Sequence, residues 1–170
     1  MSKATQITKK IYQLGYKNKK TSIVRKYPNE ELCRFFGRNF FQIKPNLRKN
    51  IKILETGCGM GNNLRMISEE GFSTFGIDIS EEAIRLSKKL FKKKRLKCNF
   101  KVGDFSQTKY INNFFDCIVD VFSSCSLNRV QGEKYIKEVN RILKKNGKFF
   151  TYFPSKKSDM FSFKSQKKFD

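Results

Sequence analysis

The sequence has no histidine and no tryptophan, only 3 prolines, and far fewer acidic than basic residues. Without histidine, and with 5 cysteines that form no Cys-x-x-Cys pair, familiar zinc-ligand spacings are absent. No run approaches the ~20 apolar residues of a membrane-spanning helix, and the N-terminus lacks a signal-peptide core. We therefore expect reduced, mostly buried thiols and a cytoplasmic location, with neither a metal site nor a membrane partner.

What the chain has in excess is positive charge. Its 37 basic residues against 15 acidic ones give a net charge of +22. Such a balance is typical of proteins that bind nucleic acid or other polyanions. Lysine far outnumbers arginine, however, and the basic residues are spread along the chain, which also fits the codon bias of an AT-rich genome. The two interpretations carry equal weight.

With 170 residues, 38% of them hydrophobic, the chain is long enough for one domain with a real core. The first ~20 residues are polar and weakly periodic, so we expect a flexible or loosely docked arm. The next segment, "NEELCRFFGRNFF", predicts a short amphipathic helix capped by Asn29. Its phenylalanines, Phe35 and Phe36, either pack in the core or cover a ligand site. Residues 1–48 are thus expected to form an arm and a helix ahead of a domain at 49–170.

From residue 51 onward, apolar strands alternate with amphipathic helices. The strands are expected at 51–55, 73–79, 98–105, 114–122 and 148–154, and the helices at 63–70, 81–94 and 132–145. This alternation predicts an α/β fold: a mostly parallel, Rossmann-like sheet of about five strands, flanked by helices in three layers. In such a sheet the ligand crevice lies at the carboxyl ends of the strands.

The stretch "ETGCGMG", residues 55–61, follows the first strand and opens the next helix. Glycine is needed where a Cβ would collide with a ligand or forbid the turn, and the helix N-terminus offers unpaired N–H groups. The spacing G-x-G-x-G lacks the third glycine of the dinucleotide fingerprint, where Asn62 stands, so NAD fits badly. A P-loop fits worse, because no Gly-Lys-Ser/Thr follows.

These residues resemble the class I S-adenosylmethionine-dependent methyltransferases, and within them the small-molecule branch. The glycine loop is one of five elements that match in order over about residues 50–154. The others are the acid in "GIDIS", the acid in "VGDF", the segment "FDCIVDVFSS", and the helix-to-strand segment "EVNRILKKNGKFF". The resemblance implies S-adenosylmethionine as the cofactor and a methyltransferase activity.

The same resemblance implies roles for individual residues. Asp78 would bind both ribose hydroxyls, a task that suits a carboxylate as a bidentate acceptor. Asp104 would accept from the adenine amino group, and Asp120 would lie beside the methionine part of the cofactor. The full set of expected cofactor-binding residues is Glu55, Gly57, Cys58, Gly59, Gly61, Asp78, Ile79, Asp104, Phe105 and Asp120. Cys58 is expected there as a small filler and not as a nucleophile.

Methyl transfer from a sulfonium is an in-line displacement, so proximity and orientation supply most of the acceleration. With no histidine, the candidates for a general base are Asp120 and Tyr27, followed by Glu30 and Glu31. We expect the acceptor to be an oxygen or nitrogen atom of a small molecule. An RNA-directed methyltransferase, or a cofactor-binding remnant without turnover, are the alternatives.

The family sheet usually has seven strands, whereas this sequence runs only about 16 residues past the fifth predicted strand. The closing segment "SKKSDMFSFKSQKKFD" is short and polar. We therefore expect a shortened domain, in which the fifth strand is an exposed edge that could pair with another copy.

Overall fold

A computed structural model of the chain describes residues 3–18 and 26–155. Its helices are α1 (Lys3–Lys17), α2 (Glu30–Asn39), α3 (Pro45–Arg48), α4 (Asn62–Glu69), α5 (Glu81–Lys94), the 3₁₀ turn η1 (Ser124–Ser126) and α6 (Arg129–Ile142). Its strands are β1 (Lys52–Thr56), β2 (Ser73–Asp78), β3 (Asn99–Val102), β4 (Phe115–Val121) and β5 (Leu143–Tyr152).

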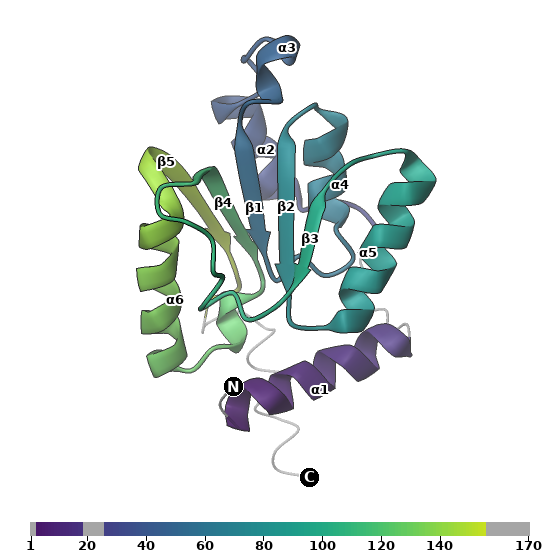
Figure 1. The fold of residues 1–170 in the computed structure, drawn as a ribbon, viewed down its shortest axis with the longest axis vertical. Helices are drawn as coiled ribbons and strands as arrows, with labels where there is room; N and C mark the ends of the chain where they lie inside the picture. The colour runs from purple at the N-terminus through teal and green to yellow at the C-terminus, as the bar shows by residue number, and fades with distance from the viewer. Residues whose placement is uncertain (1–2, 19–25, 156–170) are drawn as a thin grey trace.

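The five strands form one sheet in the order β3-β2-β1-β4-β5, and every neighbouring pair is parallel. The order reverses between β1 and β4, which is where open α/β sheets bind their ligands. Helices α2, α4 and α5 cover one face, and α6 covers the other (Figure 1). The expected Rossmann-like α/β fold is therefore confirmed.

Two apolar cores lie on the two faces of this sheet. The first joins α2, α4 and α5 to the sheet, through residues such as Phe36, Ile67 and Phe91. The second packs α6 onto the opposite face, with Tyr135 only 1% exposed against Leu54 and Ile118. Because both faces are covered, the central strands bury most of their residues, as strands of parallel sheets generally do.

Helix caps follow the sequence signals closely. The side chain of Asn29 accepts from Leu32 N, as predicted, and that of Ser80 accepts from Ala83 N at the start of α5. Helix α5 also has Glu81 and Glu82 in its first turn and lysines in its last, which complements the helix dipole. These local signals fix where α5 begins, directly after the end of β2.

The region between α6 and β5 differs from the prediction. Helix α6 ends at Ile142 and β5 begins at once, so Asn146 and Gly147 lie within the strand and not at a helix end. Phe115 pairs with Leu143 while Cys117 pairs with Lys148, so β5 bulges between these pairs. Asn146 there has a φ of 65°, a conformation that asparagine tolerates better than most residues.

The prediction of a loose N-terminal arm is wrong for residues 3–17, because they form α1, which lies across the carboxyl ends of the strands (Figure 1). Phe36 is fully buried and Phe35 packs against Phe150, so both phenylalanines of α2 belong to the core.

Strand β5 is an edge of the sheet within the described part of the chain. Most of the polar closing segment to which the sequence prediction referred, residues 156–170, lies outside the described residues. Over residues 3–18 and 26–155, no helix has the length and apolar character that crossing a membrane requires.

Candidate functional site

The loop between β1 and α4 has three glycines with positive φ: Gly57 at 63°, Gly59 at 52° and Gly61 at 76°. A Cβ on Gly57 would collide with the side chain of Ser123, and one on Gly59 with the hydroxyl of Tyr16. Both glycines are therefore required by backbone conformation and by close neighbours across the pocket. They line a pocket at the carboxyl ends of the strands.

Gly61 is needed for packing of the loop and not for the pocket. It is the N-cap residue of α4, and a Cβ there would press on Phe91 at 3.1 Å and Phe100 at 3.3 Å. This glycine allows the loop to pack onto α5 and β3, and it does not line the pocket.

Asp78 ends β2 and ties the glycine loop to it. Its Oδ2 accepts from Gly59 N and its Oδ1 from Ser80 N, both at 2.8 Å. The side chain lines the pocket but is only 6% exposed, and burial raises the pKa of its carboxyl while these hydrogen bonds oppose the shift. A carboxylate has lone pairs to spare beyond two such bonds, so Asp78 can still accept from a ligand.

Glu55 ends β1 on the same wall. Its Oε1 accepts from Asn63 Nδ2 at 2.6 Å, whereas its buried Oε2 has no hydrogen-bond partner within the described residues. Burial raises the pKa of this carboxyl to about 8. An unpartnered buried acceptor in a pocket wall is costly unless a ligand satisfies it.

Asp120 is fully buried behind the pocket and does not line it. Its carboxylate accepts from Ser123 N at 3.0 Å and Ser124 N at 3.2 Å, and burial raises its pKa. It thus shapes the turn after β4, which brings Ser123 against Gly57.

Asp104 is also absent from the wall: its Oδ1 accepts from Ser106 N and from Ser106 Oγ. Its neighbour Phe105 does line the pocket, as does Ile79 after β2. Of the residues that the sequence predicts, the pocket brings together Glu55, Gly57, Cys58, Gly59, Asp78, Ile79 and Phe105, but not Gly61, Asp104 or Asp120.

Cys58 is buried in this loop, with burial raising the pKa of its thiol well above the usual value. Among the candidate bases, Tyr27 lines the pocket and is 68% exposed. Glu30 pairs with Arg34 at 2.7 Å on the exposed side of α2, and neither Glu30 nor Glu31 reaches the pocket wall.

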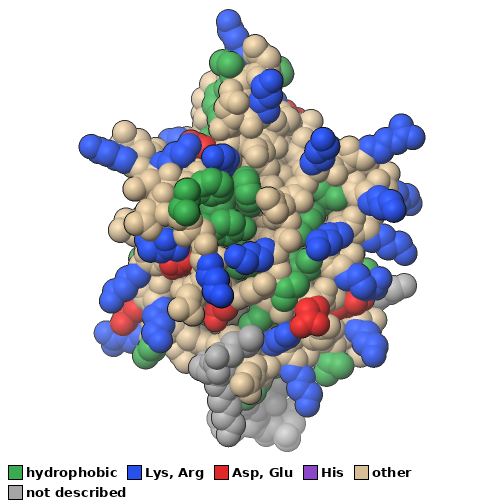
Figure 2. Space-filling model, in the orientation of Figure 1, with side chains coloured by type: hydrophobic (Ala, Val, Ile, Leu, Met, Phe, Trp, Pro, Cys, Tyr) green, Lys and Arg blue, Asp and Glu red, His purple; other side chains and the backbone are tan. Residues whose placement is uncertain are grey.

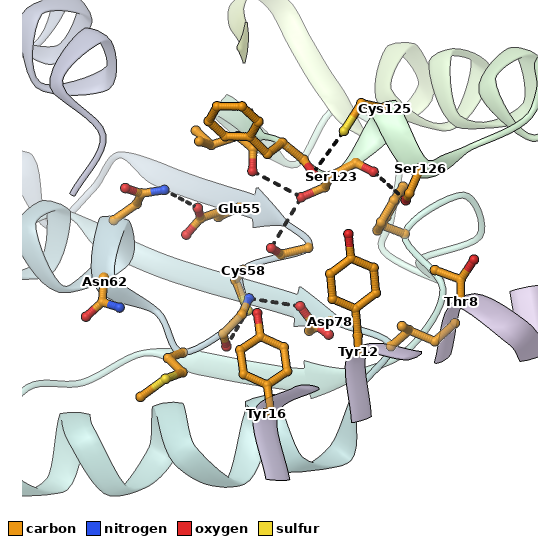
Figure 3. Close-up of a pocket in the computed structure, with 18 of the residues that line it drawn as sticks. Thr8, Tyr12, Tyr16, Glu55, Cys58, Asn62, Asp78, Ser123, Cys125 and Ser126 are labelled. Atoms are coloured by element: carbon orange, nitrogen blue, oxygen red, sulfur yellow. Dashed lines mark hydrogen bonds between the residues drawn. The ribbon is translucent and has the colours of Figure 1, made fainter. Parts of the chain in front are cut away.

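Helix α1 supplies the part of the pocket that the sequence interpretation missed. Thr8, Tyr12 and Tyr16 line the wall opposite the glycine loop (Figure 3). Their four-residue spacing places them on one helical face, and this was the available signal. The hydroxyl of Tyr16 lies against Gly59, and burial together with nearby Asp78 raises its pKa.

Polar contacts hold α1 in place across the pocket. Gln13 Oε1 accepts from Ser80 Oγ at 2.8 Å and from Glu82 N at 3.3 Å. Lys9 pairs with Glu81 at 2.8 Å, and Gln131 of α6 donates to Thr5 at 3.0 Å. The helix is therefore attached to both sides of the sheet's carboxyl edge.

The resulting cavity has a volume of about 290 Å³, near the lower end of the range for ligand pockets. Two carboxylates, Glu55 and Asp78, stand in its wall, and Asp120 lies close enough to raise the pKa of Glu55 further. In a chain with net charge +22, this local excess of acids favours a ligand that is cationic where it meets Glu55.

The chain is similar to known proteins in sequence and in fold. A protein-family model described as "Methyltransferase domain" matches residues 53–147, more than half of the chain. The ubiquinone biosynthesis O-methyltransferase of Pelagibacter ubique is 36% identical over 102 residues, covering 60% of this chain and 41% of that relative. The chain thus spans less than half the length of this curated relative.

Two solved structures are similar in fold. The PH0226 protein of Pyrococcus horikoshii is 26% identical with a TM-score of 0.64, over 85% of this chain and 65% of that one. The [4+2]-cyclase SpnF has a TM-score of 0.67 at 18% identity, over 84% of this chain and 58% of that one. Because one of these neighbours is a cyclase, likeness of fold does not by itself specify the reaction.

Proposed function

The chain belongs to the class I S-adenosylmethionine-dependent methyltransferase domain family, and on that premise we propose that it methylates an oxygen or nitrogen atom of a small molecule. Its cofactor is S-adenosylmethionine. The proposed acceptor atom is supported by the O-methyltransferase among its relatives. A cytoplasmic location, and the division into an extension at 1–48 and a cofactor-binding domain at 49–170, are parts of the same proposal.

The observation that carries the proposal is Oε2 of Glu55 beside the glycine loop, which has no hydrogen-bond partner among residues 3–18 and 26–155. The amino group of the cofactor's methionine part is a cationic donor of the kind this oxygen lacks. Asp78 would accept from the ribose hydroxyls, while Ile79 and Phe105 offer apolar surface for the adenine. Gly57, Cys58 and Gly59 would form the loop beneath the cofactor.

For Asp104 and Asp120, a direct contact with the cofactor has less support. Both hold turns beside the pocket through backbone hydrogen bonds, and neither lines it. Their support for cofactor binding is therefore indirect, through the positions of Phe105 and Ser123.

The bound cofactor supplies an electrophilic methyl group, and the chain's own residues orient the partners and exclude water. Helix α1 closes one side of the pocket with Tyr12 and Tyr16. Tyr27 offers a third hydroxyl, on the exposed side, and its phenolate form would accept the proton that the acceptor atom loses.

The test is product formation. The chain is incubated with S-adenosylmethionine and separate panels of phenols, amines and total RNA, and S-adenosylhomocysteine is measured. Turnover with a phenol or amine, lost in Asp78→Asn and retained in Asp116→Asn at the opposite end of the sheet, supports the proposal.

Turnover with RNA alone would instead support the RNA-directed alternative, for which the net charge of +22 is the supporting observation. That activity should fall steeply with salt, because phosphate contacts release counterions. Cofactor binding without product from any panel would support a remnant without turnover.

A further inference from the structure

Helix α1 leaves a stripe of apolar side chains exposed to solvent. Its exposed face has Ile7, Ile11 and Leu14, with exposed fractions of 53%, 58% and 47%. Its opposite face meets the domain: Thr5 and Tyr16 are buried there, and Gln13 hydrogen-bonds to the start of α5. Helices on the surface of a soluble domain normally bury the apolar stripe and expose the polar one.

The apolar stripe is continuous. Its three residues are four and three positions apart, so their side chains form one row along about two turns of helix. Lys10 and Lys17 are exposed, and each stands three residues after a stripe residue, so they flank the row on one side. Among residues 3–17 there is no acidic side chain.

The chemistry of this face selects among possible occupants. Stacking of nucleic-acid bases needs exposed aromatic rings, and the stripe is aliphatic. A second copy of the chain would bring the same net charge of +22, and Figure 2 shows basic side chains spread over the face in view, so charge repulsion opposes association. An aliphatic row beside lysines matches an anionic bilayer, where the row enters the acyl boundary and the lysines meet lipid phosphates.

We propose that the outer face of α1 docks on the surface of an anionic lipid bilayer. The sequence interpretation excluded a membrane partner because no segment can span one, but a helix lying in the interface needs no spanning run. Since Thr8 and Tyr12 on the inner face line the pocket, docking would bring the pocket to the lipid surface. This inference does not depend on methyltransferase activity.

The test is cosedimentation of the full chain with phosphatidylcholine vesicles, with and without phosphatidylserine. We expect the chain to pellet only with the anionic vesicles. The double variant Ile7→Ser/Ile11→Ser should bind the anionic vesicles more weakly by about ten-fold or a larger factor, because two apolar side chains are lost from the interface. Ile136→Ser removes an isoleucine that is 54% exposed on α6, and should bind like the unaltered chain.

Circular dichroism controls for folding, and amide exchange maps the contact. Slower exchange within residues 7–14 on adding anionic vesicles supports docking through α1. No binding to anionic vesicles overturns the proposal. Equal binding by Ile7→Ser/Ile11→Ser and the unaltered chain also overturns it, because retention would then come from net charge alone. So does self-association that the double variant abolishes, since the stripe would then be a protein interface.

Discussion

Glu55 is the residue whose environment differs most from that of an ordinary carboxylate. Burial raises the pKa of its carboxyl to about 8, against a usual value of 4.5. At neutral pH its protonated form is therefore favoured in the folded chain without ligand. A cationic ligand would favour the ionised form.

The first prediction concerns stability without cofactor. A raised carboxyl pKa stabilises the fold fully below pH 4.5, and this contribution is lost as the pH rises toward 8. Because Glu55 ionises in the unfolded chain while it stays protonated in the folded one, the unfolding free energy should fall by up to about 1.4 kcal/mol per pH unit in this window. Glu55→Gln keeps an acceptor for Asn63 but has no carboxyl to ionise, so its unfolding free energy should not fall in this window. At pH 8 the variant should therefore be more stable than the unaltered chain. Urea denaturation at pH 5 and pH 8 measures both; parallel behaviour of the two proteins would contradict the buried, unpartnered state of Glu55.

The second prediction contrasts two glycines. Gly59 has φ 52°, and a Cβ there meets Tyr16, so Gly59→Ala should destabilise the chain by about 1–2 kcal/mol or more. Gly132 lies in α6 with no atom within 4 Å of its Cβ position, so Gly132→Ala should stabilise by about 0.5–1 kcal/mol. Denaturant midpoints give both values. If both variants changed the stability in the same direction, the glycine loop would not have the conformation that the structure shows.

At the residue scale, sequence reasoning placed Glu55, Gly57, Gly59 and Asp78 correctly at the carboxyl ends of adjacent strands. It could not separate Gly57 and Gly59, which line the pocket, from Gly61, which makes room for Phe91. The spacing is the same for all three, and only the neighbouring side chains in space distinguish them.

Helix α1 is the element that sequence reasoning interpreted least well. The side of α1 that meets the domain has no continuous apolar stripe, because its docking combines the buried ring of Tyr16 with hydrogen bonds of Gln13 and an ion pair of Lys9. Local pattern identifies apolar faces, whereas a polar docked face looks like a solvated one. The strands β1, β2 and β4, by contrast, each place apolar residues such as Leu54, Ile77 and Ile118 in the core, and they were easily found.

The third prediction concerns this docking. Gln13→Ala removes the acceptor for Ser80 and Glu82, so α1 should open more often, with amide exchange in residues 8–16 faster by about ten-fold. Gln6→Ala, an exposed position on the same helix, controls for helix propensity and should change little. Equal exchange in both variants would show that Gln13 does not hold the helix.

For the whole molecule, alternating strands and helices determine the topology, since right-handed crossovers leave few alternatives for parallel strands. The net charge of +22 did not help to predict the topology, because net charge says little about fold. The structure adds one point that composition concealed: Glu55, Asp78 and Asp120 lie close together at the carboxyl edge. These three acids come from three different strands, so only the fold brings them together, and no single segment of the sequence reveals it.

The central claim, that this edge binds S-adenosylmethionine, is tested most directly by calorimetric titration of S-adenosylmethionine and S-adenosylhomocysteine. We predict micromolar binding of both, at one site per chain, and a loss of about ten- to a hundred-fold in Asp78→Asn, as for a lost charge-assisted hydrogen bond. Asp116→Asn, whose carboxylate accepts from Lys52 N away from the pocket, should bind normally. No binding by a folded chain, or equal binding by Asp78→Asn, would contradict the assignment of the site.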